Sequence, residues 1–111
     1  MATTIDAGTF AELQAAAGND FVRELIDTFL EEAPPMLAEL RATVAAANAD
    51  AFRRAAHSLK SNASTFGALT LAAMARDLEL QGLAAATPAA LGALAQHYDE
   101  VAAELKALRD A

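Results

Sequence analysis

The chain has no cysteine and no tryptophan, and it has a single tyrosine among its 111 residues. Without cysteine it can form neither a disulfide framework nor a thiolate metal site, and it has no cysteine nucleophile. Aromatic residues make up only 5%, and alanine, the residue with the highest helix propensity, supplies much of the 55% hydrophobic content. The composition therefore predicts an all-α protein with a core of leucine, alanine and phenylalanine.

Long hydrophobic runs are also missing. No apolar stretch approaches the roughly 18 residues that a membrane-spanning helix needs. The first ten residues, MATTIDAGTF, lack the basic and apolar regions of a signal peptide. We therefore expect a cytoplasmic protein without membrane contact. The length fits one domain, with residues 1–8 frayed and residues 9–111 forming it.

Basic residues are few, and the net charge of −7 argues against nucleic-acid binding. Their distribution is uneven. The segment from Ala51 to Arg76 holds four of the eight basic residues and none of the fifteen acidic ones. Its formal charge is +4, whereas the remainder of the chain carries −11. Such a positive segment suits an anion or an acidic partner surface, although solvated charges can also cluster by chance.

Helical spacing of apolar residues predicts four substantial helices after a short leading one. The leading turns span 9–17, and a long element with Asn19 as its N-cap is either kinked at Pro34 and Pro35 or divided into two helices there. The next helix is expected at 49–65, with Asn48 as N-cap and with Gly67 ending it in a left-handed conformation. The last two are expected from Ala68 or Thr70 to Gly82 and from Thr87-Pro88 onward. Short connections between them predict an antiparallel up-and-down four-helix bundle with a short N-terminal extra helix.

One of the two histidines, His57, lies in the middle of the helix expected at 49–65. At roughly 100° per residue, the apolar side chains of this helix fall within about 40° of one direction, which we take as the core. These side chains are Phe52, Ala55, Ala56, Leu59, Ala63 and Phe66. His57 lies roughly 140° from that direction. The imidazole is therefore expected on the outer face, as surface decoration or as a solvent-facing functional group.

The neighbours of His57 narrow the chemistry. Arg53, Lys60, Ser61 and Ser64 share its stripe, so a cation lies one turn on and small side chains lie beyond it. This surface suits a nucleophilic imidazole that a partner can reach, with an ammonium that could stabilise an attached phosphoryl group. No acidic or histidine residue stands three or four positions from His57, which disfavours both a metal site and a hydrolytic triad. No Gly-rich phosphate loop is present.

The stretch His57-Ser58-Leu59-Lys60, the small residues 61–64 and Phe66-Gly67 resemble the signature of histidine-containing phosphotransfer (HPt) domains. The resemblance extends from Asn19 to the C-terminus. It implies a four-helix bundle in which an exposed histidine accepts a phosphoryl group from a receiver-domain phospho-aspartate or a hybrid histidine kinase. The histidine then passes that group to a response-regulator aspartate. It also implies a phosphocarrier without ATP binding or kinase activity, no cofactor of its own, and Mg²⁺ supplied by the partner receiver.

Transferred to this chain, the resemblance makes His57 the phosphoacceptor through Nε2 and Lys60 the residue that stabilises phosphoryl charge. The family usually has glycine directly after the lysine, whereas this chain has Ser61, whose side chain narrows the space for a receiver. The resemblance also implies a polar residue on the following helix that binds His57 Nδ1 and fixes its tautomer. Glu79 is at the matching place, with an ordinary solvated glutamate as the alternative, and Gln81 is a weaker candidate. The residues expected to contact the partner are Arg53, Arg54, Ser61, Ser64, Gly67 and Arg76, where the alternative for the three arginines is that they only solubilise the protein.

Two alternatives remain beside the phosphocarrier. The first is an adaptor bundle that binds a partner without accepting phosphate, which the Ser61 departure favours. The second is an ATP-using kinase module, disfavoured because no nucleotide-binding domain is present. Receiver domains and a hybrid histidine kinase are the expected partners, and the chain is expected to be a monomer. The other histidine, His97, has no motif around it and is interpreted as a surface residue.

Overall fold

The computed structural model describes residues 4–111, and this part of the chain contains helices and no strand. The expected all-α class is confirmed. In chain order the elements are α1 (Ala7–Ala17), α2 (Asn19–Ala45), α3 (Ala49–Thr65), α4 (Leu69–Gln81), the short 3-10 helix η1 (Gly82–Ala85) and α5 (Pro88–Asp110). The sequence did not predict η1.

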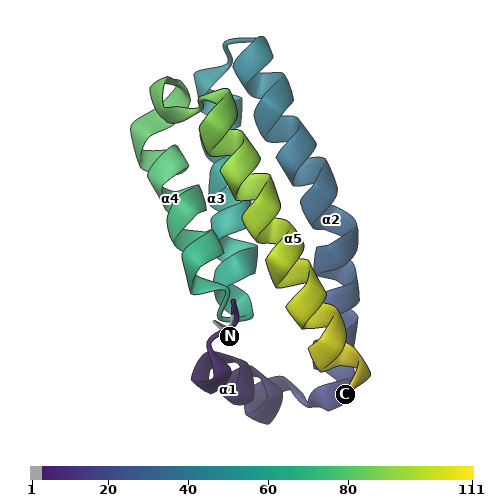
Figure 1. The fold of residues 1–111 in the computed structure, drawn as a ribbon. Coiled ribbons are helices and arrows are strands. Elements are labelled where there is room, and N and C mark those ends of the chain that lie inside the picture. The colour runs from purple at the N-terminus through teal and green to yellow at the C-terminus, as the bar shows by residue number, and fades with distance from the viewer. Residues whose placement is uncertain (1–3) are drawn as a thin grey trace.

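The four longer helices lie side by side (Figure 1). Helix α2 packs against α3 and α5, α3 packs against α4, and α4 packs against α5, so the four form a closed ring of neighbours. The short α1 lies across one end, where it contacts α2 and α3. Each connection between α2, α3 and α4 is only a few residues long, which favours neighbours that run in opposite directions.

Two of the expected helix starts are confirmed by their caps. The side chain of Asn48 accepts a hydrogen bond from the amide of Ala51 at 3.1 Å, so α3 begins at Ala49 as expected. The hydroxyl of Thr87 accepts one from the amide of Ala90 at 3.1 Å, and Pro88 is the first residue of α5. Both caps satisfy amides that have no partner within the helix.

The expected start of α2 was wrong in detail. Asn19 is already helical, and the N-cap is Gly18, whose φ of 87° is accessible mainly to glycine. The prolines do not divide the helix, because α2 continues through Pro34 and Pro35. Both prolines lie on the exposed side, where water can hydrate the carbonyl groups that lose their amide donors.

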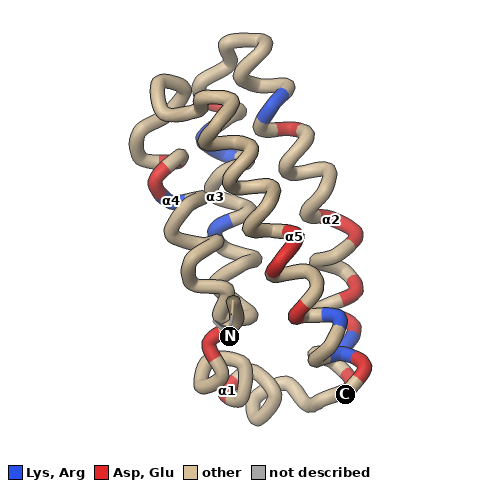
Figure 2. Tube along the Cα trace, viewed as in Figure 1, with Lys and Arg blue, Asp and Glu red and all other residues tan. Residues whose placement is uncertain are grey.

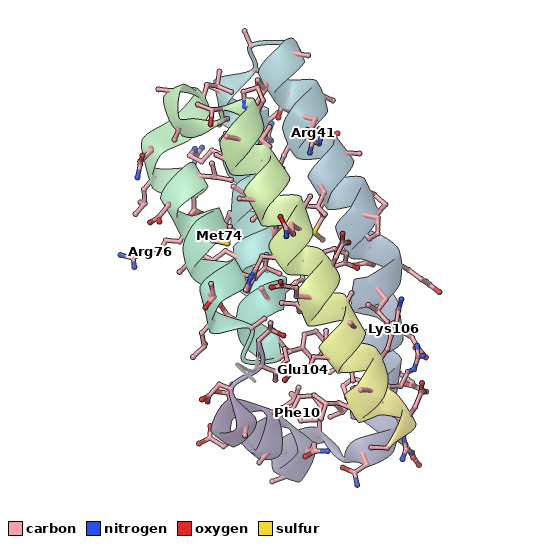
Figure 3. The ribbon with its side chains drawn as sticks, viewed as in Figure 1. Phe10, Arg41, Met74, Arg76, Glu104 and Lys106 are labelled. Atoms are coloured by element: carbon pink, nitrogen blue, oxygen red, sulfur yellow. The ribbon has the colours of Figure 1, made fainter. Side chains whose placement is uncertain are left out.

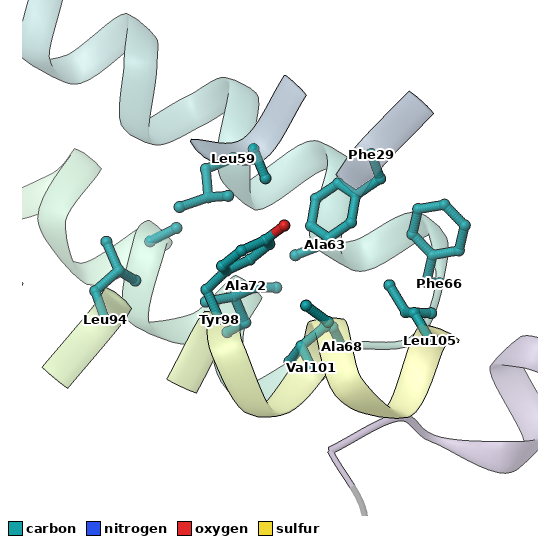
Figure 4. Close-up of a cluster of buried hydrophobic side chains, with 14 of the residues drawn as sticks. Phe29, Leu59, Ala63, Phe66, Ala68, Ala72, Leu94, Tyr98, Val101 and Leu105 are labelled. Carbon is teal, nitrogen blue, oxygen red and sulfur yellow. The ribbon is translucent and has the colours of Figure 1, made fainter. Parts of the chain in front are cut away.

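The core lies between α2, α3, α4 and α5 and consists mainly of aliphatic and aromatic side chains (Figure 4). The ring of Phe29 contacts those of Phe66 and Tyr98, with centroid distances of 5.4 and 5.8 Å. The largest side chains that are fully buried are Phe52, Ile26, Leu40, Leu59, Leu71, Leu94, Leu105 and Val101. Burying each such side chain contributes about 1.5–3 kcal/mol, so this interior fixes the position of α3.

Residues 4–8 are attached to the helices, which corrects the expectation that residues 1–8 fray. Ile5 is only 3% exposed and belongs to the core. The Glu104 carboxylate accepts hydrogen bonds from the Thr4 amide and hydroxyl at 2.8 and 3.0 Å and from the Ile5 amide at 3.2 Å (Figure 3). Helix α1 begins at Ala7, two residues earlier than expected. Residues 1–3 lie outside the described part of the chain.

His97 is not a surface residue, contrary to the interpretation of the sequence. Its side chain is only 19% exposed, and Nδ1 lies 3.3 Å from a carboxylate oxygen of Glu100. The other ring nitrogen, Nε2, is buried without a hydrogen-bond partner in the described structure. The helix periodicity of α5 did not reveal this burial, because His97 lies beside the apolar stripe and not on it. Between residues 4 and 111, no helix is both long and apolar enough to cross a membrane.

Candidate functional site

Helix α3 presents His57 to solvent while its opposite face is fully buried. The imidazole side chain is 62% exposed. Phe52, Ala56 and Leu59 on the same helix have no exposed surface. Because those residues are packed against the neighbouring helices, the helix cannot rotate to hide the histidine. The outward orientation expected from the periodicity of residues 49–65 is confirmed.

Glu79 on α4 holds one nitrogen of the imidazole. Its Oε2 lies 2.5 Å from Nδ1 of His57, and its side chain is only 13% exposed. A carboxylate next to Nδ1 favours a proton on that nitrogen, which leaves Nε2 with its lone pair. Among the hydrogen bonds within residues 4–111, none involves Nε2 of His57. The contact that the sequence predicted between Glu79 and Nδ1 is therefore present in the structure.

The same carboxylate also binds Lys60. The ammonium of Lys60 donates to Oε1 of Glu79 at 2.8 Å, and its distance to Oε2 is 3.4 Å. The hydrogen bond from Lys60 is the largest cause that holds the pKa of the Glu79 carboxyl below its usual 4.5, and the bond from His57 adds to it, while burial opposes both. Glu79 therefore stays ionised and joins the imidazole and the ammonium in one cluster.

Small polar side chains extend beyond His57 along the same face of α3. Ser61 and Ser64 are both exposed. The hydroxyl of Ser64 donates to the backbone carbonyl of Lys60 at 2.9 Å, so it is occupied within its own helix. Neither residue carries a side chain that would cover the imidazole. The surface on this side of His57 is therefore open to a large partner.

The basic residues near the site have different surroundings. Arg53 and Arg54 both pair with Asp50, at 2.8 and 3.1 Å, so part of the positive charge on α3 is compensated. Many of the acidic residues lie instead on α2 and α5 (Figure 2). Arg76 on α4 is exposed and extends away from the helices (Figure 3). These pairs were not predicted from the sequence, because Asp50 lies one residue before the segment without acidic residues. The spacing of three and four residues to the arginines was the signal that could have revealed these pairs.

Two of the residues proposed from the sequence have other surroundings. Gln81 is exposed and makes no hydrogen bond to His57 in the described structure, so the partner of Nδ1 is Glu79 alone. Gly67 is buried and has a φ of 81°, as expected for a helix end, and its contact with a partner stays a prediction. A Cβ atom added there would lie 2.8 Å from Cβ of Thr9 and 3.0 Å from the carbonyl oxygen of Asp6. Gly67 therefore lets the N-terminal segment pack against the end of α3.

The comparisons with known proteins agree with this geometry. No curated protein sequence gives a significant match. Among solved structures, the chain is similar to the histidine-containing phosphotransfer protein B (HptB) of Pseudomonas aeruginosa PAO1, with 29% sequence identity and a TM-score of 0.88. That match covers 99% of this chain and 97% of the other. The family of Hpt domains matches residues 24–111, which include both His57 and its partner carboxylate. Because this match spans most of the sequence, the chain belongs to the Hpt domain family.

Proposed function

We propose that this protein is a phosphorelay intermediate in which Nε2 of His57 carries the phosphoryl group. The observation that carries the proposal is the exposed imidazole whose Nδ1 is held by the mostly buried carboxylate of Glu79. Hpt domains are phosphocarriers in such relays and not kinases, which supports the assignment. The scaffold that we infer for it is an antiparallel four-helix bundle of α2 to α5, supported by their ring of contacts.

The proposed donor is a phospho-aspartate on a receiver domain or hybrid kinase. The lone pair on Nε2 attacks the phosphorus atom, the bond from phosphorus to the aspartate oxygen breaks, and the aspartate leaves as a carboxylate. A P–N bond forms and the ring becomes cationic, with its Nδ1 proton still directed at Glu79. The carboxylate stabilises that cation electrostatically. Transfer to a second receiver aspartate reverses these steps, and neither direction consumes a proton.

In this mechanism Lys60 also interacts with the phosphoryl group. Its ammonium lies against Glu79 in the unphosphorylated protein. A phosphoryl group on Nε2 brings negatively charged oxygens to the same face of α3, and these oxygens compete with Glu79 for the ammonium. The lysine can thus neutralise phosphoryl charge without a large movement. The Mg²⁺ ion that such transfers use is expected on the receiver domain.

A second candidate function, that of an adaptor that binds a partner without accepting phosphate, is kept because of Ser61. This residue stands where the family usually has glycine, on the exposed face of α3 one turn after His57. A hydroxymethyl group there reduces the room for a receiver above the imidazole. An adaptor would bind a receiver domain without accepting its phosphoryl group.

Phosphotransfer from a panel of phosphorylated receiver domains tests the proposal. The wild-type protein should acquire a label that is lost in acid and stable in base, as expected for a phosphoramidate, and His57→Gln should acquire none. His97→Gln, with circular dichroism to verify folding, is the matched control and should be labelled like the wild type. Receiver binding without any label on the wild type would refute the carrier and establish the adaptor, and Ser61→Gly would then be the first reversion.

A further inference from the structure

Among residues 4–111, three large hydrophobic side chains are exposed, and they lie at different places on the surface. Phe21 on α2 is 51% exposed, Leu69 at the start of α4 is 53% exposed, and Leu80 near the end of α4 is 68% exposed. A leucine with so much free surface contributes little to the stability of its own fold. Each of the three is therefore a candidate contact for another molecule, and their positions relative to His57 distinguish them.

Leu80 directly follows Glu79, the residue that binds both His57 and Lys60. Both line a shallow surface hollow of about 390 Å³ between the start of α3 and the end of α4. Arg53, one turn before His57, lines the same hollow together with Asp50. The hollow is therefore continuous with the phosphotransfer site, and Leu80 supplies its large apolar side chain.

Leu69 provides an internal comparison. It lies eleven residues before Leu80 on α4, so the two side chains point in directions only about 20° apart. Along the helix axis they are separated by roughly 16 Å, because each residue advances the helix by about 1.5 Å. Leu69 lies at the other end of α4, beside residues 4–6 and Gly67. Both leucines thus point outward in similar directions, but only Leu80 shares a hollow with Glu79, the partner of His57.

We propose that the receiver domain that exchanges phosphate with His57 places an apolar side chain against Leu80 in this hollow. The inference rests on the proposed phosphocarrier function and adds the side of His57 on which the partner docks. A receiver whose aspartate reaches Nε2 must cover the face of α3, and the hollow extends that face onto α4. The Arg53–Asp50 pair beside Leu80 places polar groups at the edge of the apolar contact. Such an arrangement is typical of protein interfaces.

Leu80→Gln and Leu69→Gln test the docking side, because glutamine keeps the length and helix propensity of leucine but removes the apolar surface. The receiver that labels the wild-type protein fastest in the panel is the probe. With Leu80→Gln we expect the second-order transfer rate to fall roughly tenfold while the rate at saturating receiver stays close to that of the wild type. Leu69→Gln should transfer at the wild-type rate.

The outcomes separate the two proposals. Equal rates for the wild type, Leu80→Gln and Leu69→Gln would overturn the Leu80 contact and leave the phosphocarrier intact. A loss with Phe21→Gln and none with Leu80→Gln would also overturn it, because the receiver would then dock on the side of α2. If no receiver labels the wild-type protein, the phosphocarrier itself fails, and the Leu80 contact fails with it.

Discussion

The two faces of helix α3 differ in function: one packs into the core, and the other presents His57 to solvent. The inner face carries Phe52, Ala56, Leu59 and Ala63, each with no exposed surface. The outer face carries His57, which is 62% exposed and whose only hydrogen bond in the described structure is to Glu79. Since both faces belong to one rigid helix, packing on one side determines how the chemical group is presented on the other. Stability and function should therefore respond to different substitutions on the same element.

The largest effect should come from the outer face. His57→Gln removes the only nucleophilic nitrogen of the site, so phosphotransfer should be abolished. The glutamine amide can still donate to Glu79, and exposed positions change the free energy of unfolding by no more than about 0.5 kcal/mol. Labelling by a phosphorylated receiver and urea unfolding measure the two properties. A variant that loses more than about 2 kcal/mol of stability would show that the faces are not independent.

The inner face should give the reverse result. Leu59→Ala, two residues after the histidine, leaves a cavity in the core and should lower the free energy of unfolding by about 2–5 kcal/mol. The fraction that remains folded should still accept phosphate on His57. Urea denaturation followed by circular dichroism measures the loss of stability. An unchanged unfolding midpoint would mean that the interior around α3 relaxes to fill the space.

Gly67 lies at the end of α3, where the packed helix meets the N-terminal segment. Gly67→Ala should destabilise the protein by about 1–3 kcal/mol, because the residue has a positive φ and its Cβ would meet Thr9 and Asp6. Gly92→Ala is the matched control, since that glycine lies within α5 and an added Cβ would have no atom within 4 Å apart from its neighbours along the helix backbone. Gly92→Ala should stabilise the protein by about 0.5–1 kcal/mol. Thermal unfolding of both variants should therefore shift in opposite directions, and equal shifts would contradict the tight packing at Gly67.

The smallest effect concerns the protonation of Glu79. Because its pKa is lowered in the folded protein, its contacts stabilise the fold fully above the usual value of 4.5, and this contribution is lost as the pH falls through the lowered pKa. Lys60→Met removes the largest cause and should raise the pKa of Glu79 toward the usual value. A ¹³C NMR titration of the carboxyl group measures the shift. Arg41→Met on α2 is the control and should leave it unchanged, whereas an unchanged pKa in Lys60→Met would contradict the ion pair.

Much of the site could be predicted from local patterns. The bounds of α3, its cap at Asn48 and the outward direction of His57 follow from residue spacing within one helix. Glu79 was expected from its position on the following helix, but only the packing of α4 against α3 sets its distance to Nδ1 of His57. The spacing of three and four residues could also have predicted the pairs of Arg53 and Arg54 with Asp50, although Asp50 lies just before the positive segment 51–76.

The errors concern contacts between parts of the chain that are far apart. Ile5 and Glu104 are separated by 99 positions, and no periodicity links an N-terminal segment to the last helix. The burial of His97 likewise depends on the elements that pack beside α5. Gly67 was predicted to end a helix. Its second role, which is to leave room for the N-terminal segment, depends on Thr9, which approaches it only in the folded chain.

The sequence alone thus determined most of the helical segments, the bounds of α3, and that one histidine faces outward, because these features depend on residues within a few positions of each other. Only the tertiary structure decided that the Glu79 carboxylate binds both His57 and Lys60. It likewise decided that Ile5 is buried in the core and that Leu80 shares a hollow with Glu79. These features depend on how whole helices pack against each other, and the packing energy of the entire interior sets that arrangement.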